Sequence, residues 1–157
     1  MSQFGNCQYS NSEIQKLFIT KWSTDIIPYF DTSGNLTALT GLTDFWNEIK
    51  INTVRATFVQ VMNPPNPNGI NYTETLEILV PHADLQKWLD IYDILVDRYT
   101  IVFQDANDKW FCFGWRFGTK VVSYTLEENQ YGLSFINDFS TALLTTISES
   151  FVTSNII

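Results

Sequence analysis

The sequence is poor in the residue types that catalysis and covalent stabilisation use most. It has one histidine, His82, and two cysteines, Cys7 and Cys112. A nucleophilic triad or a multi-histidine metal site would depend on that single imidazole. Two isolated cysteines give neither a disulfide framework nor a paired metal motif. We therefore interpret His82 as a structural residue at a helix start and both cysteines as reduced thiols, and we predict no catalytic residue, no metal site and no cofactor.

Basic residues are also few. Nine Lys and Arg stand against seventeen Asp and Glu, which gives a formal net charge of −8. An excess of negative charge repels a phosphate backbone instead of neutralising it, so we expect no specific nucleic-acid binding. No apolar run reaches the roughly 20 residues of a transmembrane helix. The polar start also lacks the basic and apolar regions of a signal peptide, and we expect no membrane association.

The chain is rich in residues that build a core and a sheet. Of 157 residues, 45% are hydrophobic and 15% aromatic, which is far from the composition of a disordered chain. Phe, Tyr and Trp, together with many Thr, Ile and Val, suit pleated, half-buried surfaces. We predict a mostly β protein, with a flexible N-terminal tip over residues 1–13 and a single β-rich domain over residues 14–157.

Segments of β-branched and aromatic residues alternate with turn residues along the chain. Turn chemistry at Asp31–Gly34 and at Asp105–Asp108 separates neighbouring segments, and Gly114 and Gly118 predict a bulge or bend. The patterns predict strands over residues 14–22, 26–30, 35–40, 49–62, 72–80, 100–104, 109–113, 120–126, 131–139 and 148–156.

A proline-rich loop separates two of these strands and cannot continue their ladder. With little apolar surface and few amide donors, it is predicted to project as an interaction element. The predicted interface loop comprises Asn63, Pro64, Pro65, Asn66, Pro67, Asn68 and Gly69.

One segment, residues 83–97, has apolar residues at helical spacing. Its opposite face is acidic, so the apolar stripe is expected to pack on the sheet. The core residues of this predicted helix are Leu85, Trp88, Leu89, Tyr92 and Leu95.

Two other segments have alternative interpretations. Asp105, Asn107 and Asp108 resemble an oxygen-rich calcium loop, but the required glycine and bidentate glutamate are missing, which favours a β-turn. The aromatic run from Trp110 to Trp115 could stack bases or line a cavity, but it has few basic neighbours. Core packing is the better interpretation. Carboxylate pairs for acid–base chemistry cannot be selected among seventeen acidic residues.

Six segments between residues 14 and 157 follow one another in a recognisable order. They are a strand at Ile14–Ile19, a strand at Leu36–Leu39, a strand ending in proline at Leu76–Pro81, a helix at Asp84–Val96, a hairpin at Thr100–Gly114 with Asp105, Trp110 and Gly114, and the final stretch Gly132–Leu143. This order of elements resembles that of small structural proteins of Bacteroidetes phages and prophages, including tail and connector-ring components of crAss-like phages. The sequence departs from the pattern at Asp108, where a turn glycine would be usual.

The resemblance implies a tail-tube-like fold, a twisted antiparallel β-sandwich or barrel with one amphipathic helix. It also implies a virion protein that closes into a six- or twelve-fold ring with copies of itself around the DNA passage. The implied neighbours are the portal, other ring proteins or the tail hub, and no catalytic residues are implied. The alternative is a monomeric β-barrel module that binds an apolar small molecule in an aromatic-lined cavity.

Overall fold

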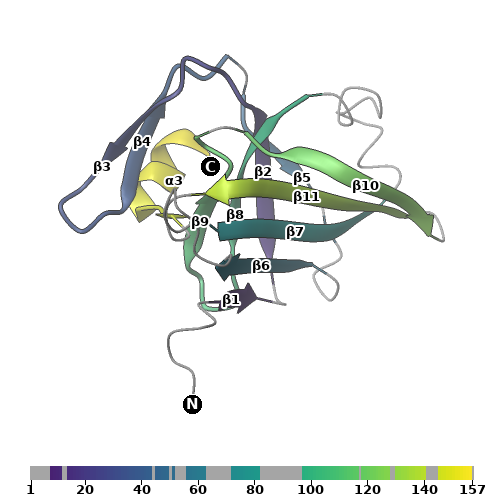
Figure 1. Cartoon of the computed structure of the whole chain (residues 1–157). Coiled ribbons are helices and arrows are strands. Elements are labelled where there is room, and N and C mark those ends of the chain that lie inside the picture. Colours follow the sequence, from purple (N-terminus) through teal and green to yellow (C-terminus); the bar gives the residue numbers. More distant parts are fainter. Residues whose placement is uncertain are drawn as a thin grey trace, which may run out of the picture.

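The computed structural model describes residues 8–11, 14–43, 45–49, 51, 56–62, 72–81, 97–116, 118–127, 130–140 and 145–156. These residues are mostly strands in three antiparallel sheets, with one short helix near the C-terminus (Figure 1). This confirms the mostly β class and the antiparallel sandwich. The described strands form separate sheets and no closed barrel.

Two five-stranded sheets make up most of the fold. Sheet A contains, in spatial order, β1 (Gln8–Asn11), β6 (Thr57–Met62), β7 (Tyr72–Pro81), β11 (Gln130–Ser140) and β10 (Lys120–Glu127). Sheet B contains β12 (Thr145–Thr146), β9 (Trp110–Phe113), β8 (Tyr99–Gln104), β2 (Lys16–Lys21) and β5 (Asn47–Ile49). The third sheet is the hairpin of β3 (Ile27–Phe30) and β4 (Leu36–Thr40), and the helix is α3 (Glu149–Asn155).

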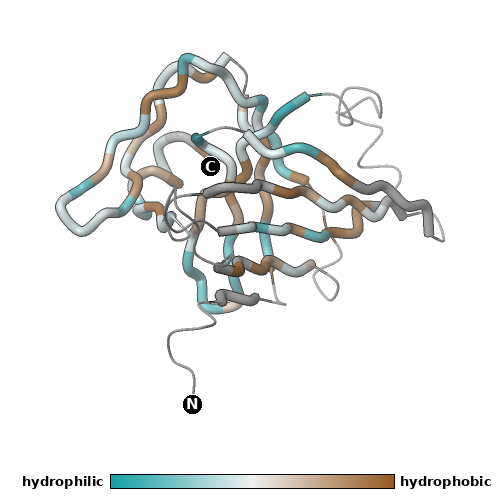
Figure 2. The backbone as a smooth tube through the Cα atoms, in the orientation of Figure 1, coloured by the Kyte–Doolittle hydropathy of each residue, from teal (hydrophilic) through white to brown (hydrophobic). Residues whose placement is uncertain are grey.

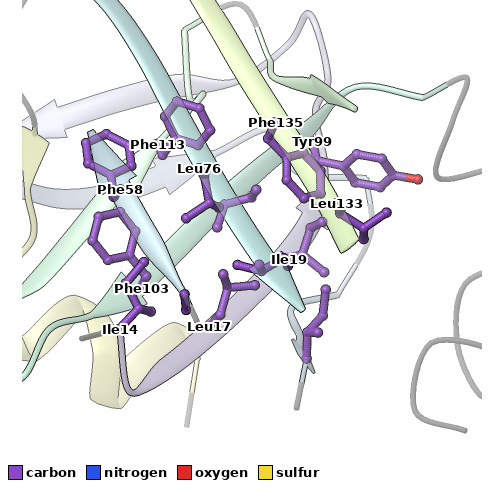
Figure 3. Close-up of a cluster of buried hydrophobic side chains, with 14 of the residues drawn as sticks. Ile14, Leu17, Ile19, Phe58, Leu76, Tyr99, Phe103, Phe113, Leu133 and Phe135 are labelled. Carbon is purple, nitrogen blue, oxygen red and sulfur yellow. The ribbon is translucent and has the colours of Figure 1, made fainter. Parts of the chain in front are cut away.

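The main core lies between sheets A and B. Phe58 on β6 is fully buried and contacts two aromatic residues of sheet B, with ring centroids 5.1 Å from Phe103 and 5.3 Å from Phe113. Leu76 is buried next to these rings, and Phe135 lies beyond it, with its ring centroid 6.5 Å from that of Tyr99 (Figure 3). Aromatic side chains from both sheets thus hold the sandwich together, as the composition predicts.

Sheet B is buried on both faces. Along β9, Phe111 and Phe113 belong to the main core, while Trp110 and Cys112 belong to a second cluster on the other face of sheet B. Strand β4 and α3 contribute Leu36, Phe151 and other apolar residues to this second cluster. The fold therefore has three layers: sheet A, sheet B, and an outer layer of the β3–β4 hairpin and α3. A strand covered on both sides needs a continuous apolar sequence, which explains the aromatic run.

The two large sheets meet at one corner. After β9 the chain bends at Gly114 and Gly118, whose φ angles are 78° and 74°. The backbones of Tyr99 and Thr119 then exchange two hydrogen bonds, of 2.9 and 2.8 Å, which join the start of β8 to the start of β10. The predicted bend at the two glycines is confirmed, because left-handed backbone conformations of this kind favour glycine.

Two strand predictions are wrong. The predicted strand over 49–62 contains the end of β5 and the whole of β6, which belong to different sheets. The predicted strand over 148–156 is α3, which Ser148 caps by accepting a hydrogen bond of 3.2 Å from the amide of Phe151. A serine at this position satisfies an otherwise unpaired helix amide. The other predicted strands are present, with each bound within two residues of the prediction.

Three further predictions concern parts of the chain that the structure describes only partly or not at all. Strand β1, at Gln8–Asn11, lies inside the stretch for which the sequence predicts a flexible tip, and it pairs with β6. The predicted helix over 83–97 lies outside the described residues apart from Asp97, as do Leu85, Trp88, Leu89, Tyr92, Leu95 and His82. The interface loop from Asn63 to Gly69 lies outside them as well, although its flanking strands β6 and β7 pair as the predicted hairpin.

Candidate interaction surface

The β3–β4 hairpin is closed by a turn that Asp31 organises. One carboxylate oxygen of Asp31 accepts hydrogen bonds of 2.9 Å from the backbone amides of Ser33 and Asn35. The hydrogen bond from the Asn35 amide holds the pKa of Asp31 below its usual value. Gly34 takes the left-handed conformation that the turn requires, with φ at 85°. The predicted turn at Asp31–Gly34 is confirmed.

Several apolar side chains of the β3–β4 hairpin are exposed to solvent. Ile27, Tyr29 and Phe30 are 53%, 50% and 46% exposed. We call these three residues the hairpin surface. The hairpin projects beside sheets A and B, and Figure 2 shows hydrophobic segments along it, away from the main core. Clustered apolar residues on a projecting element are typical of association sites.

The register of the hairpin shows which of its residues face solvent. Leu39 is buried in the second cluster, and its cross-strand partner is Pro28. Residues opposite each other in an antiparallel pair share a face, so Pro28 lies on the inner face. Ile27 and Tyr29 alternate with Pro28 and lie on the outer face. Their exposure therefore follows from the strand pattern. Phe30 pairs with buried Leu36, so it lies on the inner face and is only partly covered there.

Pro28 limits the ability of the free edge of β3 to pair with another strand. Among the described strands, β3 pairs only with β4, so its other edge is free. Pro28 has no N–H, and proline in an edge strand is a common protection against strand addition. The hairpin surface therefore offers side chains, more than backbone hydrogen bonds, to a partner.

Aromatic contacts fix the base of the hairpin surface. The ring of Phe30 lies 5.5 Å from that of Trp115 in an edge-to-face arrangement. The indole nitrogens of Trp115 and Trp22 donate hydrogen bonds to the Thr145 hydroxyl (3.0 Å) and to the Trp115 carbonyl (3.1 Å). Because these contacts hold the ring of Phe30 in place, this side chain would lose little conformational entropy when a partner binds it.

A second surface, with little net charge, lies on the opposite layer of the fold. The outer face of sheet A carries Val61, which is 40% exposed, and half-buried Val59, Thr75 and Ile136. Register places further residues on the same face. Among its side chains that the structure describes, only Glu77 and Lys120 are charged, and their charges are opposite. We call this the sheet A outer face.

The described acidic residues that could bind a metal instead form turns. A carboxylate oxygen of Asp105 accepts hydrogen bonds from the amides of Asn107 (2.9 Å) and Lys109 (3.0 Å), so the β-turn between β8 and β9 is confirmed. Asp108 takes the left-handed conformation of this turn, with φ at 62°. Within the described ranges no cluster of three or more His, Cys, Asp and Glu is placed to hold a metal.

The Cys112 thiol is buried and forms no disulfide. Burial, with a smaller contribution from the negative charge of Glu74, raises its pKa far above the usual value. A thiol that stays protonated is a poor nucleophile and a poor metal ligand. The interpretation of Cys112 as a reduced thiol is confirmed, and so is the core role of the aromatic run, since Trp110, Phe111 and Phe113 are buried.

Sequence reasoning missed the hairpin surface. The available signal was the uncharged run from Ile26 to Phe30. One face of this hairpin is exposed, and such a face would usually carry more polar side chains. The sequence predicts this strand correctly but does not say which face of it stays uncovered.

No family model matches the chain, and no curated protein and no solved structure is significantly similar to it. None of the helices described is long and apolar enough to span a bilayer.

Proposed function

We propose that this protein is a virion structural subunit that assembles with copies of itself into a ring or tube of a phage tail or head-to-tail connector. The proposal places it in the virion, and in the host cytoplasm during assembly, beside neighbours such as the portal, other ring proteins or the tail hub. Its partners are protein subunits, with six- or twelve-fold closure of the ring, and it is not an enzyme.

The observation that supports this proposal most is the hairpin surface. Three apolar side chains of β3, each about half exposed, lie on a hairpin that projects from a well-packed sandwich, and two of them, Ile27 and Tyr29, share its outer face. Association would bury them, and burying apolar area releases roughly 25 cal/mol per Å². The order of strands in the sequence, which resembles that of phage ring components, supports the same class.

The charge of the chain suits a DNA passage. A six-membered ring would carry a formal charge of −48, six times the −8 of one chain. Negative charge that faces a lumen repels the phosphate backbone, so DNA would slide through without adhering.

The alternative, a monomer that binds an apolar small molecule, has no supporting observation among the described residues. The aromatic side chains that would line a cavity pack against one another, as Phe103 does against Phe111 with centroids 5.5 Å apart.

Mass measurement in solution tests the proposal. The purified chain should form a discrete closed oligomer by light scattering coupled to size-exclusion chromatography and by native mass spectrometry, and electron microscopy should show rings. A chain that remains monomeric at every concentration, and that copurifies with an apolar small molecule, would favour the alternative.

A further inference from the structure

We propose that residues 145–156, from β12 through α3, form a latch that holds the β3–β4 hairpin on sheet B. When the latch is weakened, the hairpin and the latch open together as one unit, while the sandwich of sheets A and B stays folded. This inference concerns the single chain and does not depend on the proposed function.

The first part of the latch is bound to the edge of sheet B. Strand β12 pairs with β9 at that edge. Next to it, the amide of Ile147 donates a hydrogen bond of 3.1 Å to the carbonyl oxygen of Trp110. The Thr145 hydroxyl accepts a hydrogen bond of 3.0 Å from the indole of Trp115. These bonds fix the position of the segment that leads into α3.

The same short segment is also bound to the hairpin. The amide of Ser148 donates a hydrogen bond of 3.1 Å to the carbonyl oxygen of Leu36, and Leu36 and Ile147 form a parallel bridge. The hydroxyl of Thr146 donates a hydrogen bond to the side-chain oxygen of Asn35. Among the described residues, every hydrogen bond between the hairpin and the rest of the chain goes to the latch. The latch thus links the hairpin to sheet B.

Apolar packing joins the hairpin and the latch in one cluster. The second cluster contains Leu36 and Leu39 of β4 together with Ile147, Phe151 and Val152 of the latch, all buried on the outer face of sheet B. Helix α3 accordingly lies beside β4 (Figure 1). The main core, as far as the structure describes it, contains no residue of the hairpin or of the latch. Loss of the second cluster would therefore leave the contacts between sheets A and B in place.

Neither the hairpin nor the helix is long enough to be stable alone. A two-stranded hairpin is at best marginally stable in water. Helix α3 has 7 residues, fewer than the roughly 12 that an isolated helix needs. Each part therefore depends on the shared cluster, and a change that weakens one part should release both. Proteins commonly open in cooperative units of this kind without unfolding globally.

The Cys112 thiol reports whether the latch is closed. Cys112 pairs with Thr145 of the latch and is buried in the second cluster. In the wild-type chain the closed latch protects this thiol, and opening of the outer layer would uncover it. Thiol labelling therefore distinguishes opening of the latch from unfolding of the whole chain.

Two phenylalanines on opposite faces of sheet B give a matched pair of variants. Phe151 of α3 and Phe58 of β6 are 1% and 0% exposed. Phe151→Ala weakens the latch, whereas the control, Phe58→Ala, removes the same atoms from the main core. Both are made in a Cys7→Ser background, so that Cys112 is the only thiol. For each variant, the rate of Cys112 labelling is compared with the rate of global unfolding, and hydrogen exchange is followed by mass spectrometry.

The latch predicts different results for the two variants. In Phe151→Ala, Cys112 should react at least about tenfold faster than the chain unfolds, because the loss of a buried phenylalanine is large enough to shift a local opening equilibrium by more than that. Hydrogen exchange should rise together in residues 27–40 and 145–156, and not in β6 and β7. In the control, Cys112 should react only as fast as the chain unfolds.

A change in the hairpin provides the reciprocal test. Leu39→Ala removes a buried side chain of β4 from the second cluster. It should raise hydrogen exchange in residues 145–156 as well as in the hairpin, although it leaves the latch itself unchanged. If Phe151→Ala does not fold, Val152→Ala makes a smaller change in the latch and should give the same pattern of exchange.

Two outcomes would overturn the inference. If Phe151→Ala raises exchange in all strands alike, and Cys112 reacts no faster than the chain unfolds, the three layers unfold as one unit. If Leu39→Ala frees the hairpin alone and Phe151→Ala frees residues 145–156 alone, the latch does not hold the hairpin. Neither outcome depends on ring assembly, so both leave the proposed function untouched.

Discussion

Replacing Phe58 by alanine tests whether sheets A and B are held together as described. Phe58 is fully buried and contacts Phe103 and Phe113 across the sandwich. Truncation of a buried phenylalanine to alanine costs about 3–5 kcal/mol, because transfer free energy is lost and a cavity remains. Loss of two aromatic pairs, each worth about 0.5–1.5 kcal/mol beyond area burial, places Phe58→Ala toward the upper end. The free energy of unfolding of a domain is usually about 5–15 kcal/mol, so Phe58→Ala should remove a large fraction of it.

Urea unfolding followed by tryptophan fluorescence measures the effect. The matched control is Val59→Ala, because Val59 is the next residue on β6 and lies half-buried on the opposite face of the strand. Loss of its two methyl groups should cost about 1 kcal/mol. A Phe58→Ala variant that unfolds at the same urea concentration as Val59→Ala would refute the inward orientation of Phe58 and with it the packing of the two sheets.

Three further changes probe the outer layer. Gly41→Ala should destabilise the fold more than Gly34→Ala, as measured by urea unfolding. Both glycines have positive φ, but a Cβ at Gly41 would clash with the backbone carbonyl oxygen of Asp25, whereas a Cβ at Gly34 meets nothing within 4 Å. Equal losses of stability would contradict the packing at Gly41. In a Cys7→Ser background, Cys112 should react with a thiol reagent at pH 8 only as fast as the protein unfolds, because its thiol is buried. Rapid reaction without denaturant would show that the outer layer does not cover Cys112. Ser148→Ala should cost about 0.5–2 kcal/mol, because α3 loses the side chain that accepts a hydrogen bond from its first turn; an unchanged urea midpoint would show that the cap contributes nothing.

The strands were predictable where a single physical pattern decides the structure. Leu76 and Ile78 alternate with Thr75 and Glu77 on β7, and that alternation gives both the strand and its buried face. Both tight turns were predictable from the ability of aspartate to bond nearby backbone amides.

The misassigned segments fail for identifiable reasons. Ile49 and Ile51 alternate in one phase, whereas Val54, Ala56 and Phe58 alternate in the other, so the apolar pattern shifts by one residue between β5 and β6. Reading residues 49–62 as one strand overlooked this shift. At the C-terminus, Val152 and Thr153 suggest a strand by propensity, but Ile147, Phe151 and Val152 are spaced for one face of a helix. The cap at Ser148 and the acidic Glu149 were the signals that favoured a helix.

The candidate surfaces were harder to predict than the strands, because exposure depends on how the layers stack. Isoleucine and tyrosine at positions 27 and 29 look like core residues in the sequence, and only the packing of β4 on sheet B shows that their face of the hairpin is left uncovered. Tertiary packing outweighs residue type at such positions.

The three layers separate stability from assembly. Residues of β9 are buried on both faces of sheet B, so changes at Phe111 or Phe113 should lower stability and affect assembly only through folding. Ile27, Tyr29 and Val61 lie on the outermost surfaces, where substitutions usually change stability by less than about 0.5 kcal/mol. A change there that abolishes rings while leaving the urea midpoint intact can act only through contacts between copies. An assembly defect that always accompanies a loss of stability would instead place the contact elsewhere on the chain.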